Sequence, residues 1–179
     1  MKSIEEQLAR YKSVHLNKKN IQTHFVGVPL IVFAVTLMLS MVTFEVNMEV
    51  IFGRPFYFSF SLAMAIFSVV ALYYLVLHRL LALGMFLYIV ANLMLAELFR
   101  DTQGLIIIAL ALFVLGWLIQ FIGHYFEKAK PAFVDDLSQF LIGPLFLMAE
   151  LYFMLGLEPR LNARITPIAL EKRKALEQS

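Results

Sequence analysis

Along most of this chain, apolar residues form long runs with few or no charges, and short polar connections separate the runs. A helix needs about 20 mostly apolar residues to cross the hydrocarbon core of a bilayer. Four runs meet this requirement, and they cover residues 25–44, 57–77, 80–98 and 105–122. A fifth run, residues 137–157, is long enough but contains Gln139, Glu150 and a Gly143-Pro144 break. The pattern therefore predicts an all-α polytopic membrane helix bundle with four to five spans.

The two ends of the chain are more polar than the runs between them. We expect one membrane domain over the whole length, made of an amphipathic interfacial segment, a helix bundle and a polar tail, over residues 1–23, 24–157 and 158–179. In the first segment, four residues share one face of a helix: Ile4, Leu8, Tyr11 and His15. This spacing predicts an amphipathic helix that lies on the membrane surface or packs over the bundle. The tail ends in a charged stretch, residues 170–178, which we also expect to be helical.

Composition agrees with a protein solvated largely by lipid. Of its 179 residues, 61% are apolar and 16% are charged, and the mean hydropathy is +0.79. Soluble domains carry about 25% charged residues. Basic residues do not form a stripe interleaved with aromatic ones, so we expect no nucleic-acid partner. Because cysteine is absent, disulfides and thiolate sites are excluded, and any metal ion must be bound by imidazole, carboxylate, amide or water.

The predicted topology brings all four histidines to one membrane face. His15 and His24 precede the first run, His78 lies between the second and third, and His124 ends the fourth. Near that end, a helix would align an aromatic ring, an amide, an imidazole and a carboxylate: Trp117, Gln120, His124 and Glu127. The plainer interpretations are a hydrated helix end and hydrogen-bonded core histidines. His78, beside Arg79 in a tight turn, fits an interfacial role best.

The same histidines are also candidates for a metal site. Two or three histidines and one carboxylate form the ligand set of non-haem Fe(II) oxygenases. The chain offers such a set: His15, His24, His124 and Glu127. Since nine residues separate His15 from His24, the two can meet only if the chain turns between them. Asn20 and Gln120 would then orient the imidazole rings. Ligand type alone does not distinguish iron from zinc here.

Other charged residues are candidates for a role beside this site. Glu150 falls near the middle of the fifth run, where a carboxylate is expensive and is a functional hypothesis by default. It could hydrogen-bond as a protonated acid, or line a path for substrate or protons. Four lysines at the histidine face could attract an anionic group: Lys18, Lys19, Lys128 and Lys130.

Two blocks of the sequence resemble the signatures of a known family. The first block is Tyr11, His15, Asn20, His24, Gly27 and Pro29. The second is Gly116-Trp117, Gln120, Gly123-His124, Glu127, Lys128, Pro131-Ala132, Pro144 and Glu150. Together they resemble the family of the fungal endoplasmic-reticulum 2-hydroxy fatty acid dioxygenase, whose bacterial relatives were once catalogued as a domain of unknown function.

The resemblance implies an Fe(II)-dependent α-oxidation. A 2-hydroxy fatty acid and O₂ would give the acid that is one carbon shorter, and the matching histidines are His15, His24 and His124. It also implies a multi-pass protein of the bacterial inner membrane, or of the endoplasmic reticulum in a fungal member.

The orientation of the chain depends on whether the fifth run crosses the membrane. With five crossings, the 15 Lys and Arg residues divide eight to seven between the N-terminal side and the opposite side. If the fifth run is re-entrant, the tail returns to the N-terminal side and the division becomes thirteen to two. The positive-inside rule then places the histidine face in the cytoplasm.

Two alternative functions follow from other features. A small non-enzymatic transporter or assembly factor would use Glu150 and the Gly143-Pro144 break, since broken helices mark transport sites. The sequence shows no inverted repeat, which weighs against a transporter. Membrane di-iron desaturases and hydroxylases resemble one another in needing about eight histidines, and this chain has four. We therefore exclude that class.

Overall fold

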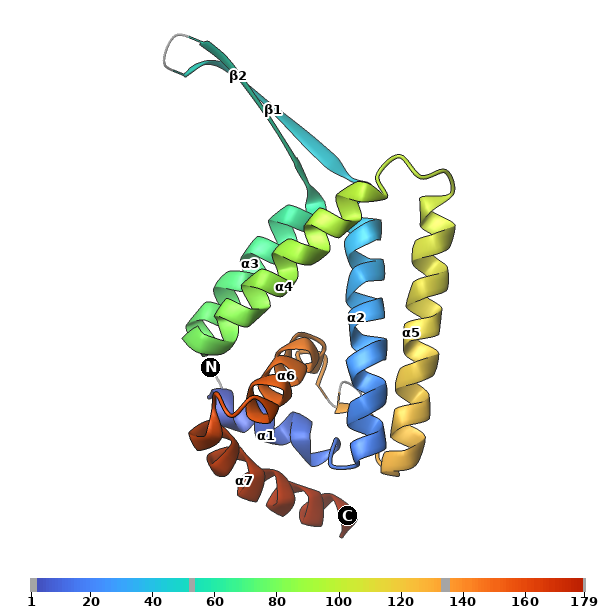
Figure 1. Cartoon of the computed structure of the whole chain (residues 1–179), viewed down its shortest axis with the longest axis vertical. Helices are drawn as coiled ribbons and strands as arrows, with labels where there is room; N and C mark the ends of the chain where they lie inside the picture. The colour runs from blue at the N-terminus through green and yellow to red at the C-terminus, as the bar shows by residue number, and fades with distance from the viewer. Residues whose placement is uncertain (1–2, 52–53, 133–135, 179) are drawn as a thin grey trace.

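The computed structural model describes residues 3–51, 54–132 and 136–178, and over these residues the chain is mainly α-helical, as predicted (Figure 1). The helices are α1 (Ile4–Ser13), α2 (Lys18–Ser40), α3 (Leu62–Leu77), α4 (Arg79–Leu98), α5 (Leu105–Glu127), α6 (Gln139–Met154) and α7 (Pro159–Glu177). Two antiparallel strands, β1 (Thr43–Ile51) and β2 (Arg54–Ser61), form a hairpin between α2 and α3.

Among the described helices, α2, α4 and α5 are long and apolar enough to cross a membrane. Helices α3 and α6 are also apolar, but each has only 16 residues. A full crossing takes about 20 residues. The structure therefore has three full-length candidate spans and two shorter apolar helices where the sequence predicts four or five spans.

The predicted span over residues 57–77 is shorter because its first part is a strand. Phenylalanine and serine alternate over residues 58–61, and a period of two is typical of a strand. Phe58 pairs with Val46, and Phe60 pairs with Phe44. The hydroxyl of Ser61 then accepts a hydrogen bond from the Met64 amide at 3.2 Å and begins α3. The hairpin projects from the end of the bundle opposite α1 and α7 (Figure 1).

Both peripheral segments are amphipathic helices that pack together. The predicted apolar face of α1 is buried along its length, from Ile4 to Tyr11, and continues to His15 beyond the helix. The polar tail is helical from Pro159, earlier than predicted. It buries one residue per turn of α7, at Leu161, Ile165 and Ala169, and α7 lies along α1.

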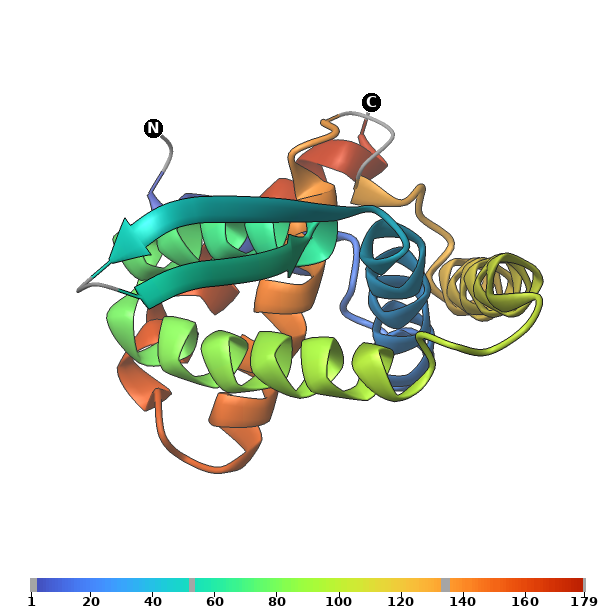
Figure 2. The ribbon, with the colours of Figure 1, turned by 90° about the horizontal axis from the view of Figure 1, so that it is seen from above.

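Helix α6 does not follow the direction of the long spans. It lies across the bundle at a steep angle to α2 and α5, and both its ends stay on the side of α1 and α7 (Figures 1 and 2). The predicted break at Gly143-Pro144 is wrong, because α6 is helical through both residues. Gly143 instead gives room to the ring of Tyr11. The tail therefore begins on the same side as α1, as in the re-entrant alternative.

Helices α2 and α5 approach so closely that backbone meets backbone. A Cβ atom added to Gly27 would lie 2.9 Å from the carbonyl oxygen of Gly116, and the reverse distance is also 2.9 Å. At the histidine face, next to His124, Gly123 similarly abuts Thr23 and Asn20. Small residues permit such contact between helices in lipid. The contact fixes the N-terminal end of α2 beside the C-terminal end of α5.

We predict that Gly116→Leu destabilises the protein by at least about 2 kcal/mol, because overpacking a tight contact typically costs 1–3 kcal/mol. The matched control is Ala111→Leu on the exposed face of the same helix. Thermal unfolding in detergent, followed by circular dichroism, measures both variants. Equal midpoints for the two variants would contradict the tight packing of α2 on α5.

Candidate metal centre

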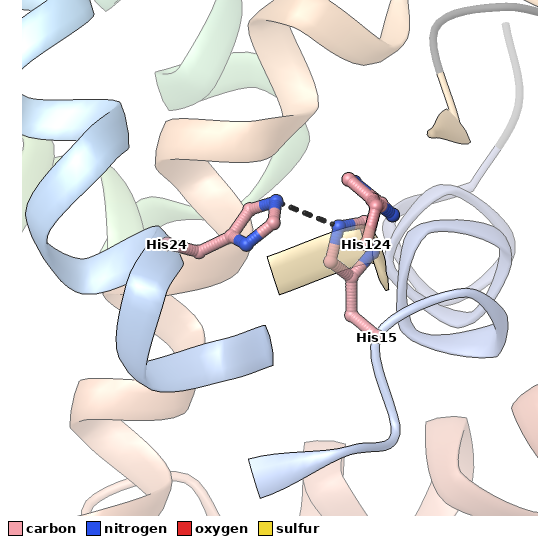
Figure 3. A group of neighbouring side chains, drawn as sticks. All are labelled: His15, His24 and His124. Atoms are coloured by element: carbon pink, nitrogen blue, oxygen red, sulfur yellow. Dashed lines mark hydrogen bonds between the residues drawn. The ribbon is translucent and has the colours of Figure 1, made fainter. Parts of the chain in front are cut away.

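Three histidines from separate segments converge where α1, α2 and α5 meet (Figure 3). His15 follows α1, His24 lies in the second turn of α2, and His124 lies in the last turn of α5. One nitrogen atom from each ring lies within 4.8 Å of the others. The ring centroids are 4.4–5.0 Å apart, and each pair of rings is within 20° of perpendicular. The predicted meeting of these residues is thus present in the structure.

Backbone carbonyls determine which nitrogen of two rings carries hydrogen. Nδ1 of His15 donates to the carbonyl oxygen of Tyr11 at 2.7 Å, and Nδ1 of His24 donates to that of Asn20 at 2.8 Å. In the neutral rings both Nε2 atoms then carry a lone pair. These two atoms are 3.0 Å apart (Figure 3). Two lone pairs at this distance repel each other unless a cation is shared between them.

The surroundings of His15 disfavour a proton in that position. The ring is 1% exposed, and it stacks on Tyr11 with centroids 4.1 Å apart and planes inclined by 3°. Burial, followed by the neighbouring His24 and His124, lowers the pKa of His15 well below its ordinary value. At neutral pH the imidazole is therefore uncharged, which is the form that binds metal ions.

A metal ion suits these donors. Neutral imidazole binds iron, zinc, copper and nickel. The carbonyls that hold Nδ1 of His15 and His24 are the kind of outer partner that orients ligating rings. Nδ1 of His124 is buried and has no hydrogen-bond partner among the described residues. Three protein ligands also leave coordination positions for a substrate or water.

The carboxylate of Glu127 does not join the three imidazoles, although the sequence suggests it as a ligand. Its Oε1 atom accepts a hydrogen bond from the amide of Leu16 at 3.1 Å. Its Oε2 atom accepts from the amide of Asn17 at 2.8 Å and from the side chain of Asn20 at 3.1 Å. The carboxylate therefore fastens the loop that carries His15 to the end of α5.

Arg173 of α7 supplies the positive charge beside this buried carboxylate. Its Nη1 atom lies 3.4 Å from Oε1 of Glu127, and its Nη2 atom donates to the backbone oxygen of Glu127 at 3.0 Å. A buried charge is tolerated when it is paired and hydrogen-bonded. Sequence reasoning missed Arg173, because it is one of 15 basic residues and lies 46 positions from Glu127. Its sequence context carries no signal for this contact.

Asn20 and Gln120, predicted to orient the imidazoles, are both buried beside them. Asn20 holds His24 through its backbone carbonyl, while its side chain binds Glu127. Gln120 lines a small pocket together with His24 and His124, and the pocket has a volume of about 80 Å³.

Glu150 is ion-paired. Its Oε1 atom accepts a hydrogen bond from Nζ of Lys12 at 2.7 Å, and the two side chains are 14% and 12% exposed. The structure therefore assigns this carboxylate a cationic partner on α1, where the sequence suggests a protonated acid or a point on a transport path. The pair connects α6 to the helix that precedes His15.

His78 and Lys128 lie outside the histidine group. Nδ1 of His78 accepts a hydrogen bond from the Leu81 amide at 3.3 Å and caps α4, and its Nε2 atom lies 3.5 Å from Glu158. His78 is thus separate from the other three histidines, and its interfacial role stays a prediction. Lys128 is exposed and ends α5 in the left-handed conformation, with a φ of 55°.

The sequence of this chain is similar to those of known proteins. A family model described as 2-hydroxy-palmitic acid dioxygenase Mpo1-like matches residues 1–155. The chain belongs to this family. It is also 34% identical over 172 residues to the 2-hydroxy-palmitic acid dioxygenase MPO1 of Saccharomyces cerevisiae. The aligned region covers 90% of this chain and 87% of the yeast protein. No solved structure matches it significantly.

Membership of the Mpo1-like family confirms the resemblance carried by the two sequence blocks. The matched region contains all three converging histidines and Glu127. It ends at residue 155, before α7 begins at Pro159. Arg173, the partner of Glu127, therefore lies beyond the region that the family model matches.

We predict that Arg173→Ala weakens metal binding by up to about 10-fold, because Arg173 pairs with the carboxylate that fastens the His15 loop, one step beyond the direct partners of ligands, which typically contribute 10–100-fold. The control is Arg164→Ala, since Arg164 lies on the same helix and its side chain is 67% exposed. Metal content after dialysis against graded chelator concentrations, measured by mass spectrometry, compares the variants. If both retain metal as the wild type does, Arg173 does not support the centre.

Proposed function

We propose that this Mpo1-like chain is an Fe(II)-dependent dioxygenase that converts 2-hydroxy fatty acids to acids one carbon shorter. The family and the 34% identity to the yeast enzyme support a dioxygenase that acts on 2-hydroxy fatty acids. The observation that carries the iron proposal is the convergence of His15, His24 and His124, with two Nε2 lone pairs directed at each other.

The proposed reaction needs no reductant besides its substrate. In it, the bond between the carboxyl carbon and the 2-carbon breaks, and the 2-carbon becomes the new carboxyl group. With the old carboxyl carbon released as CO₂, one O₂ is consumed and one water is formed. The four electrons that O₂ accepts all come from these two carbons. A single substrate and O₂ therefore balance the equation.

Bound Fe(II) would supply Lewis acidity and redox chemistry, and the redox requirement favours iron over zinc, which has none. The chain's own residues would prepare the site. The carbonyls of Tyr11 and Asn20 hold the protons on Nδ1 and direct Nε2 of His15 and His24 inward. Tyr11 and Phe146 cover the His15 ring and limit access of water to it.

We also propose that the histidine face lies in the cytoplasm. The re-entrant course of α6 supports the count of thirteen Lys and Arg residues on that side against two on the other. Exposed lysines flank the centre at the ends of α2 and α5, at Lys18, Lys19 and Lys128. They could attract the carboxylate of an acid that enters from the membrane surface.

Neither of the two features that favoured a transporter has the form which that interpretation needs. Glu150, its candidate binding group, is paired with Lys12. The helix break at Gly143-Pro144 is absent, because α6 continues through these residues.

We predict that protein purified in detergent and supplied with Fe(II), O₂ and 2-hydroxy-palmitic acid forms the shortened acid, detected by mass spectrometry. His124→Ala should lower the rate more than about 100-fold, beyond the usual effect of removing an outer partner. His78→Ala is the matched control and should keep wild-type activity. Zn(II) should not replace Fe(II).

Full activity of His124→Ala would refute the metal centre. Iron that is retained by the wild type without formation of product, across several acyl lengths, would refute the substrate.

A further inference from the structure

A second, larger pocket adjoins the small pocket beside the histidines. The small pocket is lined by His24, Gln120 and His124 on one side. The larger pocket has a volume of about 330 Å³ and lies between α2, α3, α4, α5 and α6. Five residues line both pockets: Ile31, Val32, Trp117, Phe140 and Pro144. The two pockets are therefore neighbours, and together they are called the path below, with its first end at the histidines.

The larger pocket is apolar and long. Its lining consists of aliphatic, aromatic, methionine and proline side chains, and none is charged. Along α2 the path extends from His24 to Leu39, which is about 22 Å at 1.5 Å per residue. One leaflet of a bilayer has a hydrocarbon depth of about 15 Å, half the thickness of the core. The path is therefore long enough for one lipid acyl chain.

Gln139 gives the histidine end of the path a polar group. It is the first residue of α6, is 2% exposed and lines the small pocket. Neither its Nε2 atom nor its Oε1 atom has a hydrogen-bond partner among the described residues. A buried amide without partners is costly, because it has lost its hydrogen bonds to water without replacing them. The donor and acceptor are thus suited to a ligand with both hydroxyl and carboxylate oxygens.

We propose that the path is the binding site for the substrate's acyl chain, with the chain in the larger pocket and the 2-hydroxy carboxylate beside Gln139 and the histidines. This inference rests on the proposed function for the identity of its ligand. Gln139 distinguishes a 2-hydroxy acid from an unsubstituted one by hydrogen bonding to its hydroxyl group.

Trp117 provides a direct test of binding that does not depend on turnover. It is the only tryptophan in the sequence, and it lines both pockets. Bromine quenches indole fluorescence at contact. Titration with 2-hydroxy-palmitic acid brominated at mid-chain should quench Trp117 saturably, and excess unlabelled acid should restore the fluorescence. Quenching that does not saturate would mean simple partition into detergent and would overturn the proposal.

Two adjacent valines on α3 give a matched pair of variants. Val70 lines the larger pocket, whereas Val69 is 66% exposed on the outer face. Val70→Phe fills the path and should weaken binding of 2-hydroxy-palmitic acid at least about tenfold. It should weaken binding of 2-hydroxy-octanoic acid less, because the shorter chain occupies less of the path. Val69→Phe should bind both acids as the wild type does. Equal affinities of the two variants would overturn the proposal.

Gln139→Leu tests the polar end. In the wild type, 2-hydroxy-palmitic acid should displace the brominated ligand at a lower concentration than palmitic acid does. Gln139→Leu should reduce this preference by up to about tenfold, the equivalent of one hydrogen bond between neutral groups. An unchanged preference would remove Gln139 from the site. If binding follows this pattern but no shortened acid forms with Fe(II) and O₂, the acyl path is upheld and the proposed reaction is not.

Discussion

The contact between α2 and α5 is the constraint on which the centre depends. In lipid, apolar side chains gain little by leaving one apolar neighbour for another, so close packing must hold membrane helices together. Gly27 and Gly116 provide that packing because neither places a Cβ atom between the two backbones. The next turns then bring His24 and His124 together. The positions of two of the three candidate ligands, His24 and His124, thus depend on glycines that place no side chain between the helices.

The third ligand is held by charges at the edge of the apolar region. His15 lies in a loop, and a loop needs tethers to hold a side chain within the few ångströms that a metal ion requires. Glu127 binds the backbone of this loop, and the ion pairs of Arg10 with Asp136 and of Lys12 with Glu150 hold α1 before it. Apolar packing positions the helices, and paired charges position the segment between them.

Features that depend on local spacing could be predicted from the sequence. The apolar face of α1 follows from its helical period. The spacing of His15 and His24 also set a condition, that the chain must turn between them for the rings to meet, and the structure has such a turn between α1 and α2. The strand before α3 was concealed, because a hydropathy window counts the phenylalanines of residues 57–61 without their alternation with serine.

Long-range polar partners could not be predicted in this way. Lys12 and Glu150 are 138 residues apart, and nothing near either indicates the other. Glu127 stands three residues after His124, a spacing that suits a ligand as well as it suits an anchor. Only the position of the loop between α1 and α2 separates these roles. In the sequence, Gln139 is likewise only a polar residue within an apolar run, and its place in the lining of a pocket is known from the structure alone.

The distribution of the ligands along the chain has a consequence for biogenesis. His124 is synthesised 100 residues after His24, and Arg173 follows a further 49 residues later. A nascent chain that has inserted α2 alone presents two imidazoles without the third. Because metal affinity arises only when all ligands are assembled, a metal ion at the three candidate ligands would load only after His124 has been synthesised. Metal occupancy would then report that a molecule has been synthesised past His124, and shorter chains would not carry a reactive ion in the membrane.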